Sequence, residues 1–288
     1  LFFVSDMLLT TLVDVHTLAK HLDDPNWVVV DCRFALSDPD KGYRSYLTSH
    51  VPGARYAHLN QDLSSPITPS SGRHPLPDAA LLTEKLGAWG IDNRKQVVVY
   101  DDTFGAMASR LWWLLRWLGH RRCALLDGGF PRWQREKLSV TAELPKVQPA
   151  RFMSAANHSL VVDANEVMRA LAADDRLILD ARAEERFTGD VEPLDKVAGH
   201  IPGAVNAPYE DNLDFSGEFM SDEALREHYG ALLAGRPADE VIVMCGSGVT
   251  ACHNLVALEH AGLTGAKLYA GSWSEWITDP SRPVTKGL

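Results

Sequence analysis

A cysteine in a glycine-rich loop is the first candidate for chemistry in this sequence. Residues 241–254 read VIVMCGSGVTACHN, so four apolar residues precede Cys245 and helix-forming sequence follows the loop. Gly246 and Gly248 let the loop curl, because glycine accepts backbone angles and close approaches that a Cβ resists. A curled loop turns successive N–H groups inward, and the helix adds the positive end of its dipole. We therefore expect Cys245 to be a thiolate nucleophile near neutral pH, and its persulfide to be stabilised by the same donors.

The rest of this loop is expected to bind the substrate. Ser247 offers a hydroxyl that can hydrogen-bond an anion or a reacting group. The other substrate-binding positions in the loop are Gly246, Gly248, Val249 and Thr250. The remaining cysteines, Cys32, Cys123 and Cys252, have no such setting and are expected to be buried apolar residues. No CxxC pair or metal-ligand spacing occurs among the four, and such sparse cysteines fit a reducing cytoplasm.

The sequence contains an internal repeat. Similar segments recur in the same order at offsets of 143 to 150 residues. The pairs are WVVVDCRF (27–34) with LILDARAEERF (177–187), SHVPGARY (49–56) with GHIPGAVN (199–206), VVVYDD (97–102) with VIVMCG (241–246), and LLDGGFPRW (125–133) with LYAGSWSEW (268–276). A shared order at nearly one spacing indicates an internal duplication. In this duplication Asp101 takes the position of Cys245, and an acidic side chain cannot be a sulfur nucleophile.

The duplication predicts two domains of the α/β class. Continuous apolar runs such as VVVD, VVVY and CALLD are typical of strands buried on both faces, and they alternate with the amphipathic stretches 108–119 and 252–262. This alternation predicts, in each half, a mostly parallel sheet flanked by helices. We expect an inactive N-terminal domain over residues 8–139, a linker over 140–159 and a catalytic domain over 160–288. Ligands of such sheets bind beyond the carboxyl ends of strands, which is where Cys245 falls.

Composition excludes several classes of function. The net charge of −10 argues against nucleic acid as a partner, because phosphate binding needs clustered Lys and Arg. No apolar run approaches the roughly 20 residues of a membrane helix, so no membrane association is expected. The opening LFFVSD lacks a basic region, so no signal peptide is expected. We expect a cytoplasmic monomer.

The motifs together resemble the tandem-domain rhodanese-type sulfurtransferases. The likeness spans nearly the whole chain from about residue 10, and the loop CGSGVTA is similar to that of 3-mercaptopyruvate sulfurtransferases. The resemblance implies that Cys245 takes a sulfane sulfur from a donor and passes it to a thiol, a thioredoxin-like protein or cyanide, without a metal or organic cofactor. Thiosulfate-specific relatives carry CRKGVTA. Gly246 and Ser247 replace those two cations here, which favours mercaptopyruvate, a monocarboxylate, over dianionic thiosulfate.

The resemblance also implies further site residues. Arg186, the second arginine of the DAR…R stretch, is implied to bind the donor, and its fork suits a carboxylate. Where mercaptopyruvate enzymes have another arginine, this chain has Leu194, with Lys196 nearby as a substitute point charge. His74 aligns with the histidine of the family's Ser–His–Asp relay, and Ser247 matches its serine. The aspartate position falls on Asn60, two residues before Asp62.

The repeated residues are read as structural. Asp180, Arg182, His50 and His200 recur in both halves, including the half without a nucleophile. Trp273 and Trp276 recur as Phe130 and Trp133, which favours core packing.

Three alternative functions differ in what the loop must contain. A Cys-x5-Arg phosphatase requires an arginine six residues after the cysteine, where this chain has Ala251. A thiosulfate:cyanide sulfurtransferase shares the mechanism and differs in the donor. A non-catalytic tandem module that binds a partner is the third, and the intact Cys245 loop argues against it.

Overall fold

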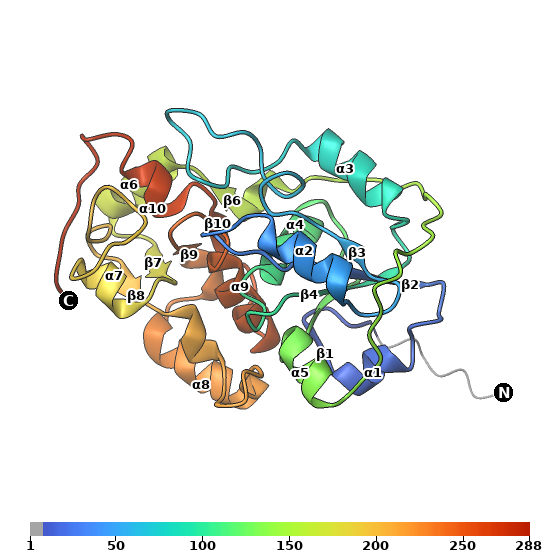
Figure 1. Cartoon of the computed structure of the whole chain (residues 1–288). Helices are drawn as coiled ribbons and strands as arrows, with labels where there is room; N and C mark the ends of the chain where they lie inside the picture. Colours follow the sequence, from blue (N-terminus) through green and yellow to red (C-terminus); the bar gives the residue numbers. More distant parts are fainter. Residues whose placement is uncertain (1–7) are drawn as a thin grey trace. The chain divides into compact units, whose positions relative to one another are not determined.

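The computed structural model describes residues 8–288, and the opening segment LFFVSD lies outside the described residues. The chain divides into two compact units. Unit 1 contains residues 8–58 and 79–156, and unit 2 contains residues 59–78 and 157–288. Each unit is described by itself, with its elements labelled in Figure 1.

Unit 1 is built on a five-stranded parallel sheet of order β1-β5-β4-β2-β3. Its strands are β1 (Leu12–Val13), β2 (Trp27–Asp31), β3 (Arg55–Tyr56), β4 (Gln96–Tyr100) and β5 (Cys123–Leu126). Its helices are α1 (Val15–Ala19), α2 (Lys41–Thr48), α3 (Ala79–Ala88), α4 (Ala108–Trp117) and α5 (Gly129–Arg135). The central strand β4 is buried along its whole length, as its continuous apolar sequence predicts.

Unit 2 repeats this sheet with the order β6-β10-β9-β7-β8, again all parallel. Its strands are β6 (Val161–Val162), β7 (Leu177–Asp180), β8 (Val205–Asn206), β9 (Val241–Met244) and β10 (Lys267–Tyr269). Its α-helices are α6 (Ala164–Ala173), α7 (Glu184–Thr188), α8 (Asp222–Leu233), α9 (Ala251–His260) and α10 (Ser272–Trp276). Short 3₁₀ turns are η1 (His158–Leu160), η2 (Tyr209–Asn212) and η3 (Ala238–Glu240). The predicted fold class, two parallel sheets each flanked by helices, is confirmed.

The registers of the two sheets are equivalent at their carboxyl edges. In unit 1 Asp31 of β2 pairs with Tyr100 of β4, and in unit 2 Asp180 of β7 pairs with Met244 of β9. The next residue along the chain is Asp101 in one unit and Cys245 in the other. The two side chains therefore occupy the same position in their respective sheets.

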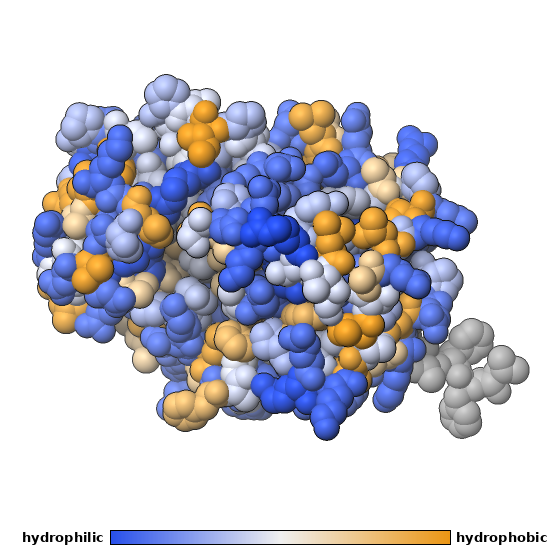
Figure 2. All heavy atoms as spheres, viewed as in Figure 1, coloured by the Kyte–Doolittle hydropathy of each residue, from blue (hydrophilic) through white to orange (hydrophobic). Residues whose placement is uncertain are grey.

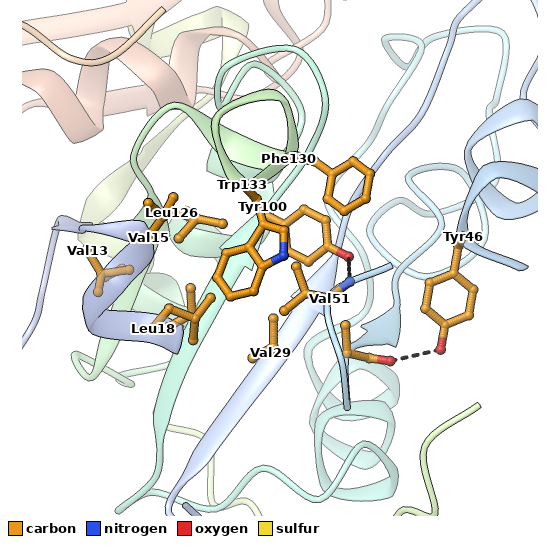
Figure 3. Packing of buried hydrophobic residues seen from close by; sticks show 13 residues of the cluster. Val13, Val15, Leu18, Val29, Tyr46, Val51, Tyr100, Leu126, Phe130 and Trp133 are labelled. Carbon is orange, nitrogen blue, oxygen red and sulfur yellow. Dashed lines mark hydrogen bonds between the residues drawn. The ribbon is translucent and has the colours of Figure 1, made fainter. Parts of the chain in front are cut away.

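Each unit has its own apolar cluster packed against its sheet. In unit 1 Trp133, which is fully buried, packs among Leu18, Val29 and Leu126 (Figure 3). The Tyr100 hydroxyl accepts a hydrogen bond from the Val51 N–H at 3.2 Å within this core. In unit 2 the corresponding cluster contains the fully buried Trp273 and Trp276. The aromatic residues that recur in the sequence thus pack in the cores, as expected.

The polar residues that recur in both halves of the sequence form hydrogen bonds and ion pairs at the carboxyl edge of each sheet. Arg182 binds the buried carboxylate of Asp180 through Nε and Nη2 at 2.6 to 3.0 Å and also donates to the Gly199 carbonyl. Arg33 and Asp31 make the same arrangement in unit 1. His200 stacks on Phe187 with ring centroids 3.7 Å apart, and its Nδ1 contacts the Phe187 carbonyl. Such contacts in both units have a structural role.

The two units do not correspond to an uninterrupted first and second half of the sequence. Residues 141–156 belong to unit 1: Ala150 and Ala155 donate backbone hydrogen bonds to Gly87 and Leu118, and Phe152 is buried. Residues 59–78, in contrast, come from the first half of the sequence and pack in unit 2. The candidate site depends on this second segment.

The surface is mixed. On the face drawn in Figure 2, hydrophilic side chains predominate and apolar ones are scattered among them. Within residues 8–288, the helices are all too short or too polar to span a bilayer.

Candidate active site

The loop after β9 is held in one conformation by helix α10. The Cys245 N–H donates to Ser272 Oγ at 3.1 Å, and the Cys245 carbonyl accepts from the Trp273 N–H at 3.0 Å. The Gly246 carbonyl accepts from the Ser274 N–H at 2.9 Å. Gly248 has a φ of +74° and lies directly against the Ala270 carbonyl, so a Cβ at this position would be both strained and obstructed.

The Cys245 sulfur lies inside the curl of this loop. The side chain is buried, and its Sγ accepts a hydrogen bond from the Gly248 N–H at 3.2 Å. Helix α9 begins at Ala251, six residues after the nucleophile, and the N–H groups of Cys252 and His253 donate to the carbonyls of Val249 and Thr250. A backbone N–H that points at the sulfur is the kind of donor from which an anion-binding loop is built.

The equivalent loop of unit 1, which follows β4, binds an anion through its backbone N–H groups. The Asp101 carboxylate, fully buried, accepts four backbone hydrogen bonds at 2.7 to 2.9 Å from its own loop. The donors are the N–H groups of Thr103, Gly105, Met107 and Ala108. The equivalent loop of unit 1 is therefore an anion nest whose anion is a side chain of the protein. In unit 2 a thiol takes the place of that carboxylate.

A histidine reaches the loop from the segment 59–78. His74 Nδ1 lies 2.8 Å from Ser247 Oγ, and both side chains are buried. The Arg73 N–H donates to Ser274 Oγ at 3.0 Å, which fixes this stretch against α10. Two of the residues that the resemblance implies, Ser247 and His74, are thus hydrogen-bonded to each other. Of the two relay alternatives, Asn60 is exposed and Asp62 is partly buried.

The predicted donor ligand Arg186 lies beside the loop and is held by two carboxylates. Its Nε and Nη2 bind Glu192 at 2.9 to 3.3 Å, and Nη2 also binds Asp195 at 3.0 Å. Burial works to raise the pKa of Glu192, but hydrogen bonds from Arg186 and from backbone amides outweigh it, and the pKa lies below its usual value. Lys196 is exposed and lines a cavity next to Asp195.

Sequence reasoning missed the second cation of the site, Arg73. A Cβ built on Gly246 would lie 2.8 Å from Arg73 Nη2 and 3.4 to 3.5 Å from the Arg186 guanidinium nitrogens. Two guanidinium groups therefore flank Gly246, although the loop itself carries no cation. Arg73 Nη1 is ion-paired with Asp195. The only signal in the sequence was that Arg73 directly precedes His74 in GRHPLP.

Comparison with known proteins identifies the family. The rhodanese-like domain model matches residues 14–136 and 163–279. The chain therefore belongs to the rhodanese family, and it contains two copies of the domain, which confirms the resemblance seen in the sequence.

Proteins named as sulfurtransferases are similar to this chain over nearly its whole length. The "Probable 3-mercaptopyruvate sulfurtransferase" of Pseudomonas aeruginosa is 51% identical over 278 residues, which are 96% of this chain and 98% of the relative. The thiosulfate sulfurtransferase of Rattus norvegicus is 33% identical, over 99% of this chain and 98% of its own length. The crystal structure of SseA from Escherichia coli, a 3-mercaptopyruvate sulfotransferase with the rhodanese fold, has a TM-score of 0.80 at 34% identity and covers 92% of this chain and 99% of its own.

Proposed function

We propose that this protein is a sulfurtransferase that moves a sulfane sulfur from 3-mercaptopyruvate, through a persulfide on Cys245, to a thiol acceptor, a thioredoxin-like protein or cyanide. The observation that carries the proposal is the buried Cys245 sulfur, which accepts an amide hydrogen bond in a loop that also contacts His74, through Ser247, and the guanidinium groups of Arg73 and Arg186. The 51% identity to the Pseudomonas relative supports the choice of donor.

The first half-reaction breaks the carbon–sulfur bond of the donor. The Cys245 thiolate attacks the mercaptopyruvate sulfur and forms the new S–S bond. The electron pair of the C–S bond passes to the carbon as the enolate of pyruvate, which then takes up one proton to give pyruvate. Negative charge develops on the keto oxygen during this step, and hydrogen-bond donors placed there lower the barrier. Ser247, oriented by His74, is the donor we assign to that oxygen.

The second half-reaction returns the enzyme to its starting state. An acceptor thiolate attacks the outer sulfur of the persulfide, so the S–S bond breaks and Cys245 leaves as a thiolate. Because pyruvate leaves before the acceptor reacts, the kinetics are of the ping-pong type. No metal or organic cofactor takes part in either step.

The donor assignment depends on the charges around Gly246. The guanidinium groups of Arg73 and Arg186 provide donors for the single carboxylate of mercaptopyruvate. Their charge is already balanced by Glu192 and Asp195, which leaves no excess positive charge for a dianion such as thiosulfate. Thiosulfate also has no carbonyl for the Ser247–His74 pair. A thiosulfate:cyanide sulfurtransferase is the second candidate, supported by the rat relative.

Mass spectrometry of the intact protein tests the proposal. Incubation with mercaptopyruvate should add one sulfur atom, and the Cys245→Ser variant should gain none. A wild-type protein without an adduct from either donor would leave only the binding-module hypothesis. The donor is then decided by kcat/KM for mercaptopyruvate and thiosulfate on one preparation, where we expect the higher value for mercaptopyruvate.

Within residues 8–288, none of the four cysteines forms a disulfide bond. This state fits the reducing cytoplasm that we propose as the location. We also propose that the protein acts as a monomer.

A further inference from the structure

An electroneutral cluster of side chains lies next to the nucleophile loop. Three arginines and three carboxylates of unit 2 are joined by ion pairs; they are Arg73, Arg182, Arg186, Asp180, Glu192 and Asp195. Arg182 and Asp180 belong to the repeated structural contact found in both units. Arg73 and Arg186 are the two cations that flank Gly246, so their partners determine how much positive charge the site offers.

Of the two partners, Asp195 is the one shared between the cations. One of its carboxylate oxygens pairs with Arg73 Nη1, and the other lies 3.0 Å from Arg186 Nη2. In this bridging geometry one oxygen faces each guanidinium, so Asp195 occupies N–H groups that would otherwise be available to the carboxylate of a donor. Glu192, in contrast, binds Arg186 alone of the flanking pair and accepts the N–H groups of Leu194 and Asp195, so it organises the loop.

Asp195 is also the less well compensated of the two carboxylates. Its side chain is 5% exposed. Burial raises the pKa of Asp195, the charge of Arg73 opposes this, and the nearby Glu192 raises it further, so the pKa stays above its usual value. Asp195 lines a cavity of about 490 Å³ together with Arg73 and Ser274. The Ser274 N–H donates to the Gly246 carbonyl. Asp195 therefore lines an open space whose wall includes Ser274, a residue hydrogen-bonded to the nucleophile loop.

We propose that Asp195 is the specificity-determining residue for donor charge. Its carboxylate stays beside the arginines that receive the donor and repels each donor in proportion to the donor's charge. A dianion such as thiosulfate therefore meets about twice the repulsive free energy that the monoanion mercaptopyruvate meets at the same distance. This inference rests on the proposed function and adds to it the residue that discriminates between the two donors.

The Asp195→Asn variant tests the inference with little change of shape. If removal of the charge lowers KM for mercaptopyruvate by a factor of about five, KM for thiosulfate should fall by the square of that factor, about 25-fold, because the electrostatic free energy scales with ligand charge. The ratio of kcat/KM for thiosulfate to that for mercaptopyruvate should then rise about fivefold. A role of Asp195 in structure alone would lower the rates with both donors and leave this ratio unchanged.

The matched control is Asp190→Asn. Asp190 lies in the same loop and accepts a hydrogen bond from Thr188 Oγ1 at 2.8 Å, so its replacement removes the same charge away from the two guanidinium groups. We expect the donor ratio of this variant to stay within twofold of wild type. An equal rise in both variants would mean that general charge, and not Asp195, sets the preference.

A second readout does not depend on sulfur transfer. Sulfate is an unreactive dianion, and its binding near Gly246 should slow the alkylation of Cys245 by iodoacetamide. At constant ionic strength, the sulfate concentration that halves the alkylation rate should fall about 25-fold in Asp195→Asn and stay within twofold in Asp190→Asn. Equal sulfate protection in wild type and Asp195→Asn would overturn the inference.

These readouts separate the two claims. If the wild-type protein gains no sulfur from either donor, the proposed function fails, while sulfate protection still decides the role of Asp195. If Asp195→Asn does not fold, Asp195→Ser removes the same charge with a smaller polar side chain. Thermal melts of each variant establish that folded protein is being compared.

Discussion

The Asp101 carboxylate is expected to hold the unit 1 loop together, and its removal should be costly. The Asp101→Ala variant takes away the acceptor of four backbone N–H groups. Two of them, on Gly105 and Ala108, belong to buried residues, whereas Thr103 and Met107 are partly exposed and can turn to water. A buried donor without a partner costs about 1–3 kcal/mol, so the two buried amides give a loss of about 2–6 kcal/mol.

The assay combines chemical unfolding with hydrogen exchange. Because a two-unit protein need not unfold in one step, exchange of the amides of residues 103–108 reports the loop directly. These amides should lose protection in Asp101→Ala, and Asp101→Asn, which keeps one acceptor oxygen, should fall between the variant and wild type. The control is Asp102→Asn, an exposed neighbour, with an expected change within about 0.5 kcal/mol. If Asp101→Ala matched this control in both measurements, the carboxylate would not be the anion of the nest.

Four further outcomes follow from the unit 2 site. Ser247→Ala should lower kcat/KM for mercaptopyruvate at least tenfold and change that for thiosulfate much less, because only the first donor has a keto oxygen; equal losses would refute the assignment. Gly248→Ala should lower the melting temperature and slow persulfide formation, since a Cβ at its φ of +74° also meets the Ala270 carbonyl. In the folded protein iodoacetamide should modify Cys245 and spare Cys123, where burial raises the pKa of the thiol; peptide mapping checks this. Glu192→Gln should destabilise the protein at neutral pH. Since the pKa of Glu192 is lowered on folding, its contribution is present above the usual value of about 4.5 and is lost as pH falls through the lowered pKa, so unfolding curves of the two proteins should converge in acid.

The sequence alone determined the architecture of this protein. Strands such as β4 and β9 are continuous apolar runs because both faces of a parallel sheet are buried. Such runs can be recognised in the sequence without knowing which residues they pack against. The offsets between similar segments predicted that Asp101 and Cys245 occupy equivalent positions in the two repeats. The registers of the two sheets agree with this prediction. The curled conformation of the nucleophile loop could be predicted from its glycines, because backbone conformation at glycine is a local property.

The tertiary structure alone decided the electrostatics of the site. Arg73 is separated from Asp195 by 122 residues and from the loop by more than 170, and only its position directly before His74 connects it with the site in the sequence. The sequence predicted a loop without cations and a single arginine, Arg186, as the donor ligand, but two guanidinium groups flank Gly246. The charge that a ligand meets is the sum of side chains brought from distant segments, and those distances are set by folding rather than by the order of residues.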